Sequence, residues 1–499
     1  MRTNVNWGVK RMRHGILLGT TTSLVAITMA CGPVRAQDAM QVDQVAGQNR
    51  AQQTMGNSID NVCPTLVGLN ADNSLDGTPT GELQRICTGM VQNAVVLNGG
   101  NPPANGFNIA DPETYNGVVQ SIAGEELQTP QLEIAKVRQT QVAAMGARLG
   151  SLRAATVTSP LSIAGFDRRR DYQIASADPE FAIAQEGDDI GGLTEAKGGR
   201  FGAFVSAGYR FGDKDDTSEV EGFDFDTGNL VAGIDYRITP SLIAGVAIGY
   251  SRFEADFDST IDSPGGQSLD NDSYSVSLYG TYYTEQGLFI DGVGRIGYGD
   301  YESDRHIFIP NPGGVDIDGD GNPDGDIDRK ARGDFDSLFF DVGLTAGYDI
   351  PLGGATVTPR VAVSYARAEI DGFSEKGAGG LNLEFDDQTA ESFTTTIGAQ
   401  ASMPLSFDFG VLTPSVNAAW VFELAGDDDG VEFRYAADPT GLSAFELAPE
   451  DKDDNYGELG FSLALALPND ISAFVDYQTV VALEDLESHA IFVGFRIGF

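Results

Sequence analysis

The chain has 499 residues, with 31 Lys+Arg against 73 Asp+Glu and a formal net charge of −42. This acidity argues against a nucleic-acid-binding protein, because phosphates require a basic surface. The 62 glycines and 9% aromatic residues suit strands and turns, and the length leaves room for two or more domains.

Residues 1–36 have the pattern of a secretory signal peptide. A basic stretch that ends at His14 precedes the apolar run ILLGTTTSLVAITMA (16–30), and VRA (34–36) supplies a small-residue cleavage site. The run is too short for a membrane-spanning helix. Lipid attachment at Cys31 is the alternative, although Thr28 and Met29 fit such a motif poorly. The pattern therefore predicts export across an inner membrane.

Residues 37–130 form a region rich in Gln, Asn and Gly, with NGGNPPANG (98–106) as an expected loop. Once the signal peptide is removed, the remaining cysteines are Cys63 and Cys87. In an oxidising compartment such a pair predicts one disulfide, and two free thiols are the alternative.

The stretch QLEIAKVRQTQVAAMGARLGSLR (131–153) predicts a helix. Val142, Met145, Leu149 and Leu152 recur at spacings of three and four. The helix is locally basic through Lys136, Arg138, Arg148 and Arg153. Packing as an ordinary amphipathic helix in a small domain is the alternative to a special role. A linker, 154–199, follows it.

From residue 200 to the end, apolar and polar residues alternate with a period of two, the signature of strands with two different faces. The predicted strands are 201–211, 229–239, 242–255, 273–284, 288–299, 337–350, 355–370, 391–402, 411–424, 456–467, 471–483 and 489–499. One face carries charges of both signs, such as Asp235, Asp291, Arg295 and Asp341, which the core of a soluble β-sandwich would not bury. A sandwich is therefore the weaker alternative.

The connections between these strands are short and long in turn. Short turns such as TPS (239–241), EQG (285–287) and PND (468–470) alternate with long acidic stretches, including 300–334 and 425–455. Short turns on one rim and long loops on the other are typical of a transmembrane barrel. The sequence thus predicts an all-β membrane protein, an antiparallel barrel of about twelve strands at 200–499 behind a small, partly helical N-terminal region.

The chain ends in the alternating run SHAIFVGFRIGF (488–499). Phe495, Ile497 and Phe499 share one face, which we expect to face lipid as the last strand closes the barrel. The free end then lies at the short-turn, periplasmic rim.

One acidic loop has the spacing of a calcium site. In VDIDGDGNPDGDID (315–328), Asp316, Asp318, Asp320 and Asp324 stand at positions one, three, five and nine around Gly321. Ile327 occupies the place where an EF-hand has Glu, so the loop resembles the DxDGDGxPD loops of extracellular repeat proteins instead. The alternatives are a Ca²⁺ site and a merely acidic surface loop. No other cofactor is expected.

A signal peptide, an N-terminal region, a thin basic helix and a C-terminal barrel that ends in Phe together resemble a classical (type V) autotransporter. The resemblance implies that the barrel anchors and helps export a passenger, 37–130, while the helix occupies the pore and sets Arg138 and Arg148 against lumenal carboxylates. A terminal aromatic strand also resembles the signal read by the outer-membrane insertion machinery. The chain departs from the family in its short passenger and in the long linker, 154–199. The helix contains no Asn-Asn pair, so self-cleavage is not expected.

The sequence therefore predicts an outer-membrane barrel, with its loops at the cell surface of a Gram-negative cell, that displays a small N-terminal region as a monomer. A self-contained porin or structural barrel with 37–199 as a plug or periplasmic domain is the alternative. An enzyme is not expected, because no GxSxG, HExxH or GDSL block occurs. The partners expected are outer-membrane lipid and the insertion machinery, with no nucleic acid and a surface ligand that the sequence does not identify.

Overall fold

The computed structural model describes residues 42–100, 106–124, 200–217, 222–257, 266–425, 430–447, 455–483 and 485–499. The expected signal peptide lies outside the described residues. The expected pore helix also lies outside them, with Lys136, Arg138, Arg148 and Arg153.

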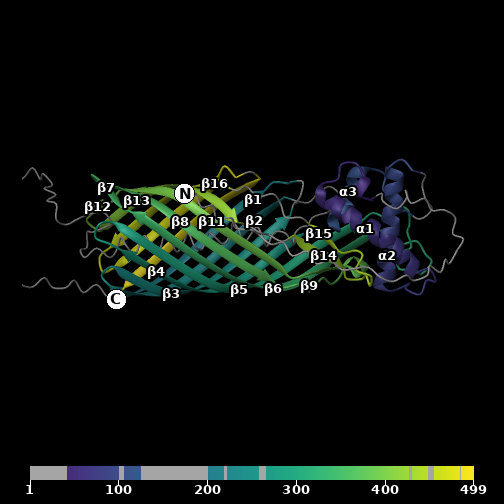
Figure 1. Ribbon diagram of the computed structural model, residues 1–499, viewed down its shortest axis with the longest axis horizontal. Coiled ribbons are helices and arrows are strands. Elements are labelled where there is room, and N and C mark those ends of the chain that lie inside the picture. The colour runs from purple at the N-terminus through teal and green to yellow at the C-terminus, as the bar shows by residue number, and fades with distance from the viewer. Residues whose placement is uncertain are drawn as a thin grey trace, which may run out of the picture. The chain divides into compact units, whose positions relative to one another are not determined.

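The described strands form an antiparallel sheet that closes on itself (Figure 1). Of its fourteen strands, β7 (Ile350–Leu352) and β12 (Leu405–Phe407) are short pieces, and the other twelve form a closed barrel. In chain order these are β1 (Phe201–Lys214), β2 (Phe223–Thr239), β3 (Leu242–Phe257), β4 (Ser268–Tyr283), β5 (Leu288–Ile309), β6 (Ile327–Tyr348), β8 (Ala355–Ile370), β11 (Gln388–Ser402), β13 (Gly410–Ala425), β16 (Asn455–Leu467), β17 (Ile471–Val481) and β18 (Leu486–Gly498). The predicted barrel of about twelve strands is confirmed.

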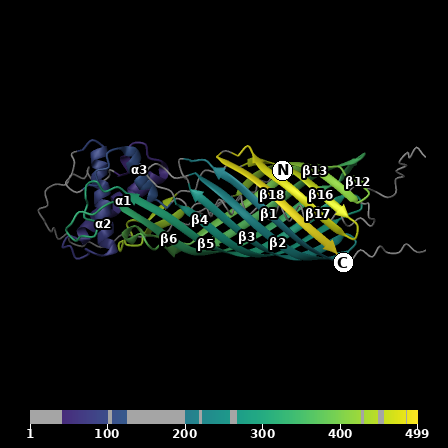
Figure 2. The same cartoon turned by 180° about the vertical axis from the view of Figure 1, so that it is seen from behind.

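The barrel closes between its first and last strands, which lie side by side in Figure 2. Gly202 is paired with Gly498, and Phe201 and Phe499 exchange backbone hydrogen bonds of 3.2 and 2.9 Å. Because each of the twelve strands has a neighbour on both sides, the wall has no open edge, and a sheet in hydrocarbon requires this.

The two faces of the wall have opposite character. On β4, Tyr274, Val276 and Leu278 are 58%, 48% and 67% exposed, while Ser277 and Tyr279 are buried. Large apolar side chains on the outside and polar ones on the inside invert the arrangement of a soluble protein. The outer face is therefore suited to lipid.

Strands β5 and β6 run much farther than the sequence suggested. Each has 22 residues, about twice the length that a strand needs to cross a membrane, and they stay paired up to Ile309 and Ile327. The expectation of a loop over 300–334 is therefore wrong for 300–309 and 327–334, and the loop is confined to 310–326. Asp300, Glu302 and Asp304 occupy outward positions of a continuing strand, and their acidity made it look like a loop.

A second, four-stranded sheet stands at the long-loop rim. It consists of β9 (Phe373–Ser374), β10 (Leu383–Phe385), β14 (Val431–Tyr435) and β15 (Phe445–Leu447), in the order β15-β14-β10-β9. Arg332 of β6 and Lys376 exchange backbone hydrogen bonds of 2.8 and 2.9 Å. These bonds join the small sheet to the long paired strands β5 and β6, which we call the extended hairpin. We call the four strands, together with 301–309 and 327–335, the rim sheet.

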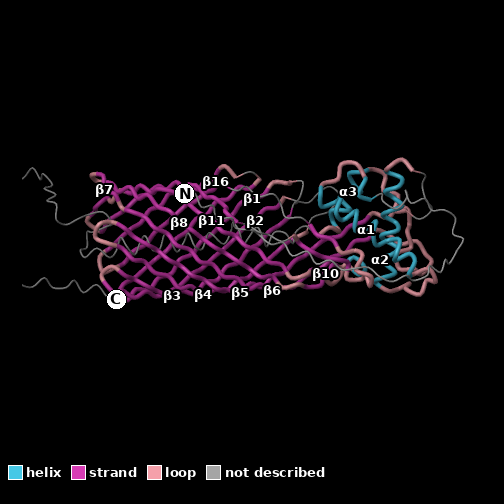
Figure 3. The backbone as a smooth tube through the Cα atoms, in the orientation of Figure 1, coloured by secondary structure: helices cyan, strands magenta, loops and turns pink. Residues whose placement is uncertain are grey.

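Residues 42–100 and 106–124 form what we call the helical cap (Figure 3). It contains η1 (Val42–Gln44), α1 (Arg50–Leu69), α2 (Pro79–Leu97) and α3 (Pro112–Ser121). Each α-helix begins at a side chain that accepts backbone N–H groups, namely Asn49, Thr78 and Asp111. The partly helical N-terminal region is thus confirmed, but its described helices lie in 37–130, where none was specifically expected. Among the described residues, no helix is both long and apolar enough to cross a membrane.

Candidate functional site

Charged side chains line the inside of the wall in pairs. Arg295 Nε donates to Asp341 Oδ2 at 2.7 Å across β5 and β6, and Arg496 Nη2 donates to Asp235 Oδ1 at 3.2 Å. Both pairs are buried, and Asp291 is buried on the same face. The three carboxylates expected in the lumen are therefore inward, and two of them are already paired with arginines of the wall.

Toward the long-loop rim the interior becomes apolar. Phe223 contacts Phe225 and Phe257, and Phe225 stacks on Phe253, with ring centroids 5.2 to 6.4 Å apart. These four rings belong to the same hydrophobic cluster as the buried residues of the helical cap, such as Met55. One core thus runs from the end of the barrel into the cap.

Polar contacts also join the helical cap to the rim sheet and its loops. Ser58 Oγ of α1 donates to the carbonyl of Ser443 at 2.7 Å, and Thr80 Oγ1 of α2 donates to the carbonyl of Ala437 at 2.8 Å. Glu82 of α2 pairs with Arg329 of β6 and accepts the N–H of Gly380 at 2.8 Å. All four contacts connect segments that are hundreds of residues apart in sequence.

The most buried charge of the described chain is Arg305 of β5. Its guanidinium pairs with Glu375, and both side chains are 1% exposed. Arg305 also donates to the carbonyls of Ser121, at the end of α3, and Leu381, each at 3.1 Å. Glu375 in turn accepts the N–H of Leu383 at 2.7 Å. This pair therefore connects the extended hairpin, the rim sheet and the cap at a single point.

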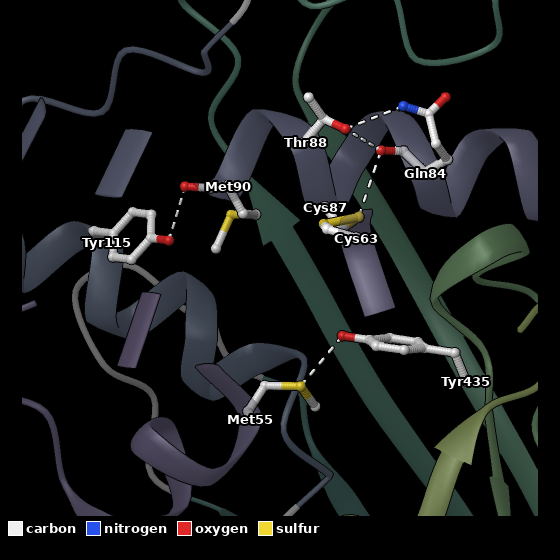
Figure 4. The surroundings of a disulfide bond; sticks show 8 residues. All are labelled: Met55, Cys63, Gln84, Cys87, Thr88, Met90, Tyr115 and Tyr435. Atoms are coloured by element: carbon white, nitrogen blue, oxygen red, sulfur yellow. Dashed lines mark hydrogen bonds between the residues drawn. A yellow bond between two sulfur atoms is a disulfide. The ribbon is translucent and has the colours of Figure 1, made fainter. Parts of the chain in front are cut away.

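The expected disulfide between Cys63 and Cys87 is present and joins α1 to α2 (Figure 4). Close to it, Tyr435 of β14 points from the rim sheet toward α1, and its hydroxyl lies 3.2 Å from Met55 Sδ. Tyr115 of α3 donates to the carbonyl of Met90 at 3.0 Å. Burial raises the pKa of Tyr115 and of Tyr435 above the ordinary range, so both stay neutral donors.

The acidic loop 315–328 brings together three of its four expected ligands. Carboxylate oxygens of Asp316, Asp318 and Asp324 lie within 4.8 Å of one another, whereas Asp320 is not in this group. Arg85 Nη1 of α2 lies 3.7 Å from Asp316 Oδ2, and the carbonyl of Asp318 accepts the N–H of Gly77 at 2.9 Å. The loop thus contacts the turn between α1 and α2, and the arginine partly balances its charge.

Two other carboxylates organise the cap and the rim by hydrogen bonding. The Arg85 guanidinium, with help from Asn70, holds the pKa of Asp76 below its ordinary value. Burial works to raise the pKa of Asp438, but hydrogen bonds from Thr440 and Ser443 outweigh it and keep the pKa low. Since Ser443 also accepts from Ser58, Asp438 shapes the loop on which α1 rests.

The chain end lies on the outer face of the wall at the short-turn rim. Phe495, Ile497 and Phe499 are 47%, 42% and 66% exposed. The ring of Phe499 stacks on that of Phe201, with centroids 6.3 Å apart. The face expected to meet lipid is therefore outward, as its alternation predicted.

Residues 203–478 match the family model of the autotransporter β-domain. The chain belongs to the autotransporter family. As an autotransporter it is a protein of the outer membrane. The interpretation from the sequence is confirmed in its family, its fold and its localisation.

Individual relatives of this autotransporter share only part of their length with it. It is 24% identical over 321 residues to Outer membrane protein B of Rickettsia conorii, covering 64% of this chain and 18% of that protein. It is 27% identical over 275 residues to Esterase EstA of Pseudomonas aeruginosa, covering 54% of this chain and 38% of that protein. The solved translocator domain of the autotransporter NalP from Neisseria meningitidis is similar with a TM-score of 0.46 and 16% identity, covering 61% of this chain and 90% of that chain.

The junction between the autotransporter barrel and its helical cap was not predicted from the sequence. No sequence pattern distinguishes Arg305, Glu375 and Glu82 from the other charged residues of an acidic, strand-rich chain. The one available signal was aromatic: Tyr301 and Phe335 continue the alternation beyond the length of a membrane-crossing strand. A buried apolar face that continues past the membrane implies a second layer to cover it.

Proposed function

We propose that this autotransporter anchors the helical cap at the cell surface and keeps it there, bound to the outer rim of its own barrel. The observation that carries the proposal is the position of the cap's contacts. They involve the rim sheet and the loops at the long-loop rim, the end of the barrel opposite to Phe499. With the chain end in the periplasm, the cap lies outside the cell.

This position argues against the alternative of a self-contained porin with a periplasmic domain. An epitope tag inserted between Ala71 and Asp72, in the exposed turn after α1, should bind antibody on intact cells. The matched control is the same tag between Pro468 and Asn469, in a short turn, which should bind only after the cells are permeabilised. The reverse pattern would overturn the proposal.

We further propose that the segment 131–153 crosses the lumen. Gly124 lies next to the rim sheet, because an added Cβ there would be 2.9 Å from Leu383, whereas β1 begins at the opposite rim beside Phe499. A connection between these two rims through lipid would leave backbone groups without partners, which favours a path through the lumen. Lys136, Arg138, Arg148 and Arg153 suit a lumen lined with charged groups. Deletion of 131–153 should raise single-channel conductance in planar bilayers, and unchanged conductance would contradict this path.

We infer that the chain works as an anchor and display protein and not as a hydrolase, and that it acts as a monomer. The relative EstA is named an esterase, but the sequence here has no GDSL or GxSxG block, and its three histidines are His14, His306 and His489. Hydrolysis of short-chain p-nitrophenyl esters by cells expressing the protein should equal that of cells with an empty vector. Light scattering in detergent should give the mass of one chain.

A further inference from the structure

We propose that the helical cap and the rim sheet are a single folding unit, so that the exported helices acquire their fold only on the outer rim of the barrel. The partner surface of the exported segment is then the barrel's own rim sheet. This inference rests on the proposed display function and states how the displayed segment is held.

A column of aromatic rings in contact with one another crosses the rim sheet, stacked in all its pairs except the edge-to-face pair of Phe433 and Phe445. Tyr301, Phe335, Phe373, Phe385, Phe433 and Phe445 follow one another strand by strand, with successive centroids 3.9 to 5.0 Å apart. Tyr301, Phe385 and Phe433 are at most 2% exposed. Without the cap, this face of the sheet would meet water, and exposed apolar patches of that size are rare on soluble surfaces.

Each layer also satisfies buried polar groups of the other. Ser58 is 2% exposed, and its hydroxyl donates to Ser443 of the rim. The Arg305 guanidinium donates across the junction to the carbonyl of Ser121, which is itself buried. Separating the layers leaves Ser58 without this acceptor and the Ser121 carbonyl without this donor, and unpaired buried polar groups are strongly disfavoured.

The fit leaves no room for an extra methyl group at two glycines on the barrel side. A Cβ on Gly380 would lie 2.7 Å from both Pro79 O and Leu83 N of α2, and one on Gly313 would lie 2.1 Å from Gly106 O. Backbone faces backbone at both places, so neither side can give way by rotating a side chain. The cap and the rim are thus packed as closely as the layers of one domain.

The cap is also small for an independent domain. A segment of about 80 residues has little core of its own, and its disulfide constrains the unfolded chain without adding buried surface. Buried residues of α1 such as Met55 pack in the cluster that includes Phe433 and Tyr435. The rim sheet therefore supplies a share of the core that the helices lack. Folding on the rim would in turn hold the exported segment outside.

The test uses single methyl groups as wedges in the full-length protein on intact cells. Gly380→Ala and Gly313→Ala each place a methyl against the cap. Gly325→Ala, in the same β5–β6 loop as Gly313, is the matched control, because nothing lies within 4 Å of its added Cβ. The readout is the rate at which Cys87, 2% exposed in its disulfide, becomes labelled by an impermeant maleimide in the presence of an impermeant phosphine. A second readout is proteolysis of the rim loop 436–444.

In the double variant Gly380→Ala with Gly313→Ala, we expect Cys87 to be labelled at least about tenfold faster than in wild type, because undocking and unfolding of the helices are one event. Labelling in the Gly325→Ala control should match wild type. If the rim loop becomes sensitive to protease while Cys87 stays protected, the helices fold alone and the inference is overturned. If the two added methyl groups change neither readout, labelling of Cys87 is measured in Phe433→Ala, which removes a ring from the rim sheet only. Unchanged labelling of Cys87 in that variant would also overturn the inference. Failure of the proposed display function is seen separately, as loss of tag binding on intact cells that carry wild-type protein.

Discussion

The barrel wall and the unit formed by the cap and rim sheet solve the same problem of burial in opposite ways. In the wall, every strand is hydrogen-bonded to the wall strands that precede and follow it in sequence, and the first and last strands, β1 and β18, pair to close the barrel. The outward side chains of these strands need only be apolar. In the cap and rim, single contacts such as Ser58 to Ser443 join residues 385 positions apart, and each depends on one specific partner. The wall should therefore tolerate substitutions that unfold the cap.

The largest effect is expected at Arg305. Arg305→Ala leaves the Glu375 carboxylate buried without its cation, and loss of one partner of a buried pair typically costs about 3–5 kcal/mol. Protease should then digest residues 42–124 on intact cells, while the barrel still migrates anomalously on gels until it is boiled.

A double variant, Arg305→Met with Glu375→Leu, serves as the control for that loss. Replacing both charges by apolar groups of similar size removes the unpaired charge, so much of the protection of the cap should return. If the double variant is as sensitive as Arg305→Ala, the ion pair is not the cause. If the barrel also loses its heat-dependent migration, the wall and the cap are not separable.

The same asymmetry explains which features could be predicted from the sequence. The wall repeats one local rule, a period of two with short turns on one side, so most of its strand ends could be placed within a few residues, with the long-loop ends of β5 and β6 as the clearest exceptions. The helices carried local signals as well: Asn49 and Gln52 form a capping box, and Met55, Ile59, Val62 and Leu66 share one face. Those signals were readable but lay in a stretch rich in Gln, Asn and Gly. The contacts of Arg305 with Glu375 and Ser121 could not be predicted, because they depend on the meeting of three distant segments.

The disulfide should stabilise the cap and leave the wall unaffected. Cys63 and Cys87 are 24 residues apart, and a loop of this size stabilises by about 3 kcal/mol in the chain-entropy account. Replacing both cysteines by serine, so that no single thiol remains, should increase proteolysis of the cap. Heat-dependent migration of the barrel should match wild type, and a cap with unchanged resistance would show that packing on the rim suffices alone.

The chain end tests the wall itself. Phe499→Asp puts a charge on the outward face beside Phe201, where the cost to stability near a membrane interface is at most about 1 kcal/mol. We therefore expect the loss to appear as less protein in the outer-membrane fraction, while the inserted molecules keep normal resistance to heat. Phe499→Tyr, which retains a ring, is the matched control. Equal amounts of all three proteins would contradict a role of the terminal aromatic in assembly.

Acid should loosen the cap before it affects the wall. Asp76 and Asp438 have pKa values below 3.8, the ordinary value, in the folded protein, so the stability they contribute is fully present above that value. It is lost as the pH falls through the lowered folded-state pKa values. Proteolysis of the cap by an acid-stable protease should thus rise below about pH 3.8. Asp438→Asn should show raised sensitivity already at neutral pH, and a flat profile in both proteins would exclude these carboxylates.

The smallest effect concerns the acidic loop, which remains a prediction as a Ca²⁺ site. The three carboxylates of Asp316, Asp318 and Asp324 repel one another, and Arg85 offsets only part of that repulsion. An extracellular loop of this kind binds Ca²⁺ with a dissociation constant of about 10⁻⁴–10⁻³ M, so a tenfold excess over that constant would stabilise the loop by about 1.4 kcal/mol. Because the carbonyl of Asp318 accepts the N–H of Gly77, the ordered loop should protect the turn between α1 and α2 as well.

Millimolar Ca²⁺ should slow proteolysis there, and Mg²⁺ should do so less, because it demands octahedral geometry and keeps its waters. Asp318→Asn should abolish the protection, whereas Asp320→Asn, outside the group of three, should weaken it less. Equal protection by Ca²⁺ in wild type and in both variants would mean that the cation only screens an acidic surface, and the loop would then be a contact of the cap without a metal.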